Sequence, residues 1–268
     1  MNDFSIFISS SDSYADLWFL FFDLFKKYWP EYNGLIYLNT ENKDFQYEGL
    51  NIKCTHVGEL GSFGKVFRAG LNKVESNYVM LIMIDFFFMG KVNNQLLNEY
   101  FKYFKDNDLD SICLKTNPYT KSNPINFKDL NIVIPPSKDM FSTQIAFWKK
   151  AVLYEMVLPH ETPWLAEWYG TLRANKIKLK LAYSTEGNAI PYLAGGALSK
   201  GKWAYQIVSF LKDAHYDVDF SRRGFFVKQS VTLKSRIKGR IYTFVPRCLS
   251  NIDLLKRECS DVFIRNHS

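Results

Sequence analysis

An acidic side chain, Asp85, interrupts the most apolar stretch of the chain. It follows an apolar run at residues 78–84 and precedes another at residues 86–89. Such a continuous run is typical of a strand buried on both faces, as in a parallel sheet. Because an unpaired carboxylate is costly inside that strand, we expect Asp85 at its carboxyl end, where open α/β sheets bind ligands. The alternative is that Asp85 only caps the next turn.

A second acid, Glu167, stands between two tryptophans. It follows Pro163 by about one turn of a helix predicted at residues 164–174, and Trp164 and Trp168 flank it. A carboxylate in this setting can act as a general base toward a hydroxyl group, and aromatic faces suit stacking against sugar rings. The alternative is an acid favoured near the helix start by the helix dipole. Glu161 is a second candidate for the base.

The elements that would position these acids alternate between strand and helix through about residue 115, which predicts βαβ units and a mostly parallel sheet. The serine-rich residues 9–13 follow the first strand and suit a polar ligand, unless Ser11 or Ser13 only caps the next helix. The proline-rich residues 117–136 predict a loop or a short edge hairpin. The expected strands are residues 4–8, 34–38, 51–56, 78–88, 111–114 and 177–183, and the expected helices are 14–29, 66–75, 92–106, 143–156, 164–174 and 202–212.

A glycine-containing segment at residues 58–66 has the look of a phosphate-binding loop but lacks the Walker A pattern. Glu59 stands where that motif requires glycine, and Val66 stands where it requires serine or threonine. We therefore exclude a P-loop and interpret residues 66–75 as a helix.

The bulk composition favours one sizeable core and anionic partners. The chain has 268 residues, 47% of them hydrophobic, and a net charge of +7. Its four cysteines form no CxxC pair, which indicates reduced thiols and a cytoplasmic protein. The N-terminus has no signal-peptide pattern, and no run reaches the roughly 18 apolar residues of a membrane span. The four histidines, His56, His160, His215 and His267, are scattered in the sequence and predict no metal cluster. The absence of nucleic-acid motifs such as paired zinc ligands argues against a nucleic-acid partner.

The C-terminal region is strongly basic. Between residues 221 and 252 the chain has no acid, and apolar residues are interleaved with the charges. This pattern predicts a peripheral element on an anionic membrane surface. The alternative is a solvated basic face on ordinary terminal helices. The eight basic residues are Arg222, Arg223, Lys228, Lys234, Arg236, Lys238, Arg240 and Arg247.

Three local patterns within residues 4–205 resemble bacterial glycosyltransferases of the GT-A type, from the group that builds capsular polysaccharide and lipopolysaccharide O-chains. The patterns are residues 4–41, the apolar strand that ends near Asp85, and residues 142–150 together with 161–167. The resemblance implies a GT-A-like, Rossmann-like α/β domain at residues 1–205. Its nucleotide-sugar half would be about 1–115 and its acceptor half about 116–205, with a basic C-terminal extension at residues 206–268.

The resemblance also implies the reaction and its site residues. A sugar would pass from a nucleotide-sugar donor to a hydroxyl of a glycan or lipid-linked glycan, with inversion and with Glu167 as general base. Asp85 would occupy the aspartate-motif position, and Arg68 would face the diphosphate or ribose. Ser9, Ser10 and Asn39 would hold the nucleoside, while Gln144, Trp164 and Trp168 would contact the acceptor.

The resemblance leaves metal dependence open. Ile84 stands where relatives commonly have a second aspartate, so Mn²⁺ or Mg²⁺ would depend on Asp85 alone and on substrate phosphates. Without a metal, Lys200 and Lys202, after the Gly195-Gly196 loop, are the candidates to neutralise the leaving diphosphate. The alternative for both lysines is ordinary solvated charge.

Two other classes of function compete with glycosyl transfer. A nucleotidyltransferase that makes sugar nucleotides would need an N-terminal Gly-rich loop with arginine, but the N-terminal loop here has serines. A non-catalytic module that binds membranes or anions would explain the basic C-terminal region. It would not explain Asp85, Glu167 and the two tryptophans beside Glu167.

Overall fold

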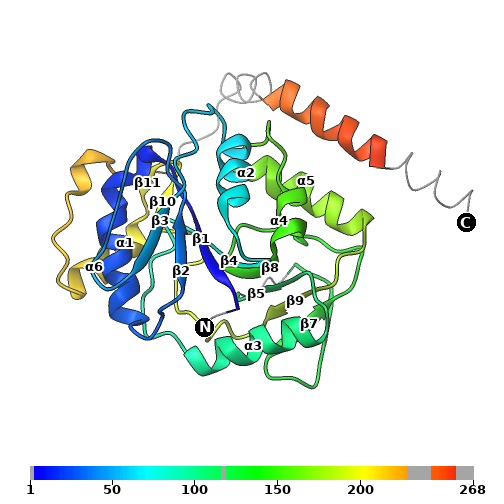
Figure 1. Ribbon diagram of the computed structural model, residues 1–268, viewed down its shortest axis with the longest axis horizontal. Helices are drawn as coiled ribbons and strands as arrows, with labels where there is room; N and C mark the ends of the chain where they lie inside the picture. The colour runs from blue at the N-terminus through cyan, green and yellow to red at the C-terminus, as the bar shows by residue number, and fades with distance from the viewer. Residues whose placement is uncertain (1–2, 116–118, 228–242, 258–268) are drawn as a thin grey trace, which may run out of the picture.

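A nine-stranded sheet forms the centre of the computed structural model, which describes residues 3–115, 119–227 and 243–257 (Figure 1). The strand order is β3-β2-β1-β4-β8-β5-β9-β7-β6. Four of the eight pairings are parallel and four are antiparallel, so the sheet is mixed and not mostly parallel as the sequence predicted. The strands are β1 Ser5–Ser9, β2 Leu35–Leu38, β3 Asn51–Cys54, β4 Tyr78–Met83, β5 Ser111–Cys113, β6 Ser122–Pro124, β7 Leu130–Val133, β8 Ala146–Lys149 and β9 Leu181–Ser184.

The parallel half confirms the βαβ units that the sequence predicts. β1 pairs in parallel with β2 and with β4, so their carboxyl ends meet at one edge of the sheet. Every residue of β1 is buried, because both faces of the sheet are covered. β4 is shorter than predicted: it ends at Met83, and the chain turns at Ile84 and Asp85. Asp85 therefore lies just beyond the carboxyl end of β4, as expected.

The prediction of a helix over residues 143–156 was wrong for its first half. Residues 146–149 form β8, which lies antiparallel between β4 and β5. Only α4, Lys150–Met156, is helical. A short apolar run does not by itself distinguish a buried strand from a buried helix, and Phe147 and Trp148 are buried against opposite faces of the sheet. At the edge of the sheet opposite β3, the strands β6 and β7 pair as the short edge hairpin predicted within the proline-rich residues 117–136.

Helices cover both faces of the sheet, and each face has its own apolar cluster. The first cluster includes Phe25 and Leu97, and the second includes Leu71 and Met156. The helices against the first face are α1 Ala15–Tyr28, α3 Asn94–Asp106 and α6 Tyr205–Asp213, and those against the second are α2 Phe63–Lys73, α4 and α5 Pro163–Lys176. This arrangement is the predicted α/β class, with a large central sheet flanked by helices.

Two helix boundaries differ from the prediction for local reasons. α2 begins three residues earlier than expected because the side chain of Ser62 caps it by accepting a hydrogen bond from the N–H of Lys65. Residues 202–203 are not helical; they form β11, Lys202–Trp203, which pairs with β10, Leu198–Ser199. The helix α6 starts only after this small hairpin, and its buried Ile207 belongs to the first apolar cluster.

The C-terminal residues 243–257 form a helix that packs on α5 (Figure 1). The carbonyl of Arg247 accepts a hydrogen bond from the hydroxyl of Tyr169, and Ser250 is fully buried. Within the described ranges, no helix combines the length and the apolar character needed to cross a membrane. Five of the eight basic residues of the predicted membrane-surface segment lie outside the described residues: Lys228, Lys234, Arg236, Lys238 and Arg240.

Candidate active site

A cavity of about 720 Å³ opens at the carboxyl edge of β1 and β4, and we call it the edge cavity. This is the point where the strand order reverses, because β1 leads to β2 on one side while β4 lies on the other. Ligands of open α/β sheets bind at such a point. The polar and aromatic residues that line the edge cavity include Ser9, Ser10, Ser11, Tyr14, Glu41, Asp85, Gln144, Trp164, Glu167 and Lys200.

The loop after β1 and the loop after β2 are tied together at this edge. The carboxylate of Asp12 accepts hydrogen bonds from the backbone N–H groups of Glu41, Asn42 and Lys43 at 2.9–3.1 Å. This arrangement holds Glu41 at the wall of the edge cavity. Sequence reasoning did not select Glu41 as a site residue, although it stands at the polar end of the predicted second strand.

Asp85 lies in the edge cavity with its carboxylate close to the backbone of the Gly195-Gly196 loop. A Cβ atom on Gly196 would lie 2.5 Å from Oδ2 of Asp85, so only glycine allows this close approach. The carbonyl of Asp85 accepts a hydrogen bond of 2.7 Å from the N–H of Ala197. Burial raises the pKa of Asp85 to about 6, although backbone N–H groups and the charge of Arg223 partly oppose the shift.

This raised pKa gives a prediction about pH and stability. Because the folded protein keeps the Asp85 proton up to about pH 6 while the unfolded chain loses it near 3.8, Asp85 should lower the stability as pH rises through this window. We expect Asp85→Asn to increase the free energy of unfolding at pH 8 by up to about 3 kcal/mol and to have little effect at pH 3. Urea denaturation at both pH values measures this, and an effect of Asp85→Asn that does not change with pH would contradict it.

Glu167 projects from α5 toward the cavity and is held in one orientation. Its Oε1 atom accepts two hydrogen bonds of 2.7 Å, one from the N–H and one from the hydroxyl of Thr143. Among the residues that the structure describes, none donates a hydrogen bond to Oε2. The helix begins at Pro163 with Thr162 as its cap, which places Glu167 in the second turn. One carboxylate oxygen is thus positioned and the other is available to a substrate.

A second cavity, of about 340 Å³, adjoins the edge cavity at Glu167, and we call it the sheet cavity. Gln144, Glu167 and Ala194 line both cavities. The amide of Gln144 is held in place, since it donates to the carbonyl of Ala194 and accepts from the hydroxyl of Tyr192, both at 3.0 Å. The sheet cavity runs along β8 and β9, and its polar lining includes Ser111, Lys115, Thr120, Asp139, Ser142 and Tyr183.

The structure brings most of the predicted site residues together. Ser9, Ser10, Asp85, Gln144, Trp164, Glu167 and Lys200 all line the edge cavity. Trp168 and Lys202 do not line it. The indole of Trp168 lies one helical turn beyond that of Trp164, and both are largely exposed. The indole N–H of Trp18 donates a 2.8 Å hydrogen bond to the hydroxyl of Ser10, which holds the serine-rich loop at residues 9–13 against α1.

Asn39 and Arg68 lie elsewhere than the predicted roles require. Asn39 is fully buried, donates to the carbonyl of Val66 and accepts from the hydroxyl of Thr55, so its side chain joins β2, β3 and α2. The guanidinium of Arg68 stacks on Tyr154 and donates to the carbonyl of Val157 at 2.8 Å. Both side chains bind protein groups and neither lines the edge cavity.

Glu161 is also unsuited to the role of base. It is fully buried and forms a bidentate ion pair with Arg173, with N–O distances of 2.9 and 2.7 Å. The hydroxyl of Ser250 and the N–H of Leu158 donate to the same carboxylate. His160 is half-buried and bonds to Ser250. These groups join α5 to the C-terminal helix, away from either cavity.

The residues present fit a divalent cation only if substrate phosphates complete its coordination. Among the described residues, no group of three metal-ligating side chains includes Asp85. A hard cation such as Mg²⁺ or Mn²⁺ can be held by one or two carboxylates together with phosphate oxygens and waters. Lys200 supplies a positive charge at the same cavity.

Comparisons with known proteins give only distant similarities. Neither the protein-family models nor the curated proteins give a match. The chain is similar to a crystal structure of S. aureus TarS 1–349, with a TM-score of 0.42 and 14% identity, over 68% of this chain and 60% of that chain. The same TarS fragment in complex with UDP gives a TM-score of 0.46 and 12% identity, over 82% and 68% of the two chains.

A UDP-glucose pyrophosphorylase complexed with UDP-glucose is also similar, with a TM-score of 0.44 and 8% identity, over 72% of this chain and 92% of that chain. The present chain spans 60% of the length of the first TarS structure. The fold class follows from the strand order and from the helices on both faces, without support from these similarities. The chain is an α/β protein with a polar cavity at the switch point of its sheet.

Proposed function

We propose that this chain is a glycosyltransferase that moves a sugar from a nucleotide-sugar donor to a hydroxyl group of a glycan. One observation carries the proposal: the positioned carboxylate of Glu167 lies where the edge cavity meets the sheet cavity. An inverting transferase needs its base within reach of the acceptor hydroxyl and next to the bound donor sugar. Two adjoining cavities that share this carboxylate meet that need.

In this proposal the nucleotide sugar occupies the edge cavity. The serine-rich loop at residues 9–13 and Glu41 offer hydroxyl, N–H and carboxylate groups to the nucleoside, and Lys200 and Asp85 both line the same cavity. A divalent cation, when bound between Asp85 and the diphosphate, would neutralise the leaving group. Lys200 contributes charge to the same end and can serve this purpose without a metal. The sugar then points toward Glu167.

The chemical step follows from this placement. The acceptor hydroxyl approaches from the sheet cavity, and Oε2 of Glu167 takes its proton as the oxygen attacks the anomeric carbon. The bond between that carbon and the diphosphate oxygen breaks, and its electron pair leaves with the nucleoside diphosphate. Because the acceptor and the diphosphate lie on opposite sides of the sugar, the transfer inverts the anomeric configuration.

The acceptor belongs, in this proposal, to surface-polysaccharide synthesis and is carried on a lipid. The sequence resemblance to capsular and O-chain transferases supports this choice. Exposed apolar side chains on α5 and on the C-terminal helix support a membrane surface, since the C-terminal helix directly follows the basic residues 228–240 in the sequence. These side chains are Trp164, Trp168 and Leu172 on α5, and Phe244, Val245, Leu249, Ile252 and Leu255 on the C-terminal helix.

A ligand-binding screen tests the donor class. We expect one family of nucleotide sugars among UDP, GDP, CMP and dTDP compounds to raise the melting temperature by mass action. At about 100 times its Kd, such a ligand stabilises the fold by about 2.7 kcal/mol. Parallel runs with Mn²⁺ and with EDTA separate a metal-assisted donor site from one that depends on Lys200. The absence of any shift with every nucleotide would overturn the proposal.

A further inference from the structure

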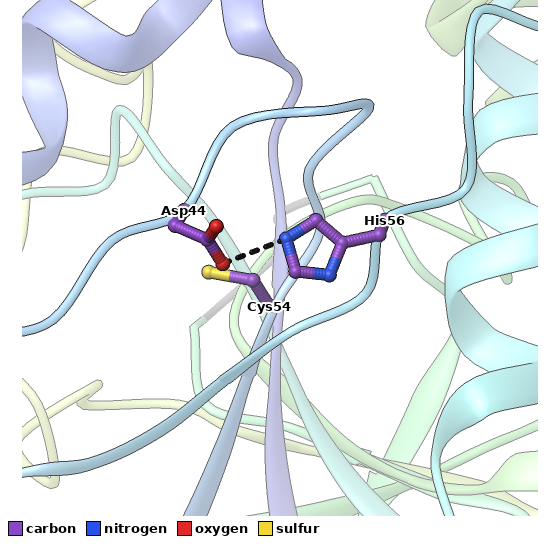
Figure 2. Close-up of side chains that lie close together, drawn as sticks. All are labelled: Asp44, Cys54 and His56. Atoms are coloured by element: carbon purple, nitrogen blue, oxygen red, sulfur yellow. Dashed lines mark ion pairs between the residues drawn. The ribbon is translucent and has the colours of Figure 1, made fainter.

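A second group of chemically active side chains lies at the edge of the sheet, at the end of β3 and in the segments that precede and follow it. Figure 2 shows Asp44, Cys54 and His56 pointing toward one another. One ligand atom from each residue lies within 4.8 Å of the other two. None of the three residues lines the edge cavity or the sheet cavity. The group is therefore separate from the candidate active site.

The three side chains combine a thiol, an imidazole and a carboxylate. Zn²⁺ and related transition metals bind this mixture, whereas Mg²⁺ and Ca²⁺ prefer oxygen ligands alone. Nε2 of His56 lies 2.9 Å from Oδ1 of Asp44. Two ligand atoms of a tetrahedral zinc ion lie about 3.3 Å apart, since each is about 2.0–2.1 Å from the metal. Asp44 and His56 are exposed, so small side-chain rotations can bring the three atoms around one ion.

The surrounding backbone fixes two of the three ligands. Sγ of Cys54 lies 3.3 Å from the N–H of Phe45, which donates toward the sulfur, and β3 holds the residue by pairing with β2. His56 has a left-handed backbone with φ of 46°, and its N–H donates to the hydroxyl of Thr40 at 3.2 Å. Outer groups of this kind orient metal ligands and tune their affinity.

The local charge also favours a cation. The carboxylates of Asp44 and Asp12 lie near the Cys54 sulfur and place negative charge around it. A bound metal ion would balance this charge and would stabilise the thiolate form of Cys54. The thiol proton then passes to solvent as the metal binds.

We propose that Asp44, Cys54 and His56 form a binding site for one Zn²⁺-class ion, with solvent at the fourth position. The ion would join residues 44–45 to the end of β3. The loop that contains Asp44 begins at Glu41, which lines the edge cavity. A bound ion would therefore also restrict the motion of the loop at that side of the cavity. The proposal does not depend on the proposed glycosyl transfer, because its test measures metal binding alone.

The test is metal titration of the full chain in a reducing buffer with a non-chelating reductant. The titration uses a Cys248→Ser, Cys259→Ser background, so that the exposed Cys248 and the C-terminal Cys259 cannot bind metal. We expect one Zn²⁺ per chain by calorimetry and one Co²⁺ with a thiolate-to-cobalt charge-transfer band. We expect Cys54→Ser to abolish that band, and His56→Ala or Asp44→Asn to weaken the affinity at least tenfold.

Cys113→Ser is the matched control, since Cys113 is also partly buried but lies on β5. It should leave stoichiometry and affinity unchanged. If Cys54→Ser is poorly folded by circular dichroism, Asp44→Asn decides the question, because the Asp44 side chain is exposed. The same Co²⁺ spectrum in Cys54→Ser, or unchanged Zn²⁺ affinity in both His56→Ala and Asp44→Asn, would overturn the proposal.

Discussion

Replacing Glu167 by glutamine is expected to lower the turnover of sugar transfer by about 10²–10⁴-fold, the usual contribution of a positioned general base. Glutamine has nearly the same shape and can still accept the hydrogen bonds from Thr143, but it cannot take the acceptor proton. The donor should still bind, because the residues proposed to contact the nucleoside and the diphosphate line other parts of the edge cavity and are unchanged. Steady-state kinetics and the thermal shift with donor measure the two effects separately.

A matched control is Glu99→Gln on α3, which removes a partly exposed carboxylate that lines neither cavity. It should retain wild-type turnover. The role of Glu167 is disproved if Glu167→Gln keeps wild-type turnover. A loss of both turnover and donor binding would instead indicate that Glu167 positions the donor.

Replacing Arg173 by methionine should cost about 3–5 kcal/mol of unfolding free energy, the usual cost of removing one partner from a buried ion pair. The change leaves the carboxylate of Glu161 fully buried with hydrogen bonds but without its counter-charge. It also removes the hydrogen bond from Arg173 to the carbonyl of Met156, at 2.6 Å. Urea or thermal denaturation followed by circular dichroism gives the free energy directly.

The double variant Glu161→Leu, Arg173→Met provides the control. Because it removes both charges and keeps an apolar filling, it should recover much of the lost stability. A double variant that is less stable than Arg173→Met alone would show that Glu161 stabilises the fold even without Arg173, through its remaining hydrogen bonds. Either result bears on the packing of the C-terminal helix, since Ser250 bonds to Glu161.

Sequence patterns predicted the parallel half of the fold because local and tertiary signals agree there. Residues 78–83 are apolar throughout, and they form a strand buried on both faces with Asp85 beyond its end. The amphipathic spacing of α3 likewise matches its buried side, which includes Leu97, Tyr100 and Phe104. In both cases the burial pattern repeats with the period of the element that forms.

The antiparallel strand β8 could not be identified in this way. Residues 146–149 are continuous in sequence with α4, and no turn residue separates them. The choice between strand and helix depends on the hydrogen-bonding edges of β4 and β5, between which the segment pairs. Those partners lie more than thirty residues away along the chain, and a local pattern does not contain them.

Side-chain partners decide which polar residues face a ligand, and these partners are also distant in sequence. Asn39 and Arg68 have polar side chains that could contact a nucleotide. Asn39 directly follows β2, and Arg68 lies on the helix that precedes β4. The amide of Asn39 forms hydrogen bonds with Thr55 and Val66, and the guanidinium of Arg68 donates to the carbonyls of Tyr154 and Val157. Glu41 gains its position from Asp12, twenty-nine residues earlier. Strand ends in the sequence indicate the neighbourhood of the site and not its individual side chains.

The sequence by itself determined the α/β class, the place of Asp85 at a strand end and the setting of Glu167 beside Pro163 and Trp164. These features depend on apolar periodicity and on backbone limits that act within a few residues. Only the tertiary structure decided that Glu167 stands between two cavities, that Glu161 is buried against Arg173, and that Asp44, Cys54 and His56 meet. The reason is physical: a site is made by side chains from separate segments, and their distances are set by how the whole sheet and its helices pack.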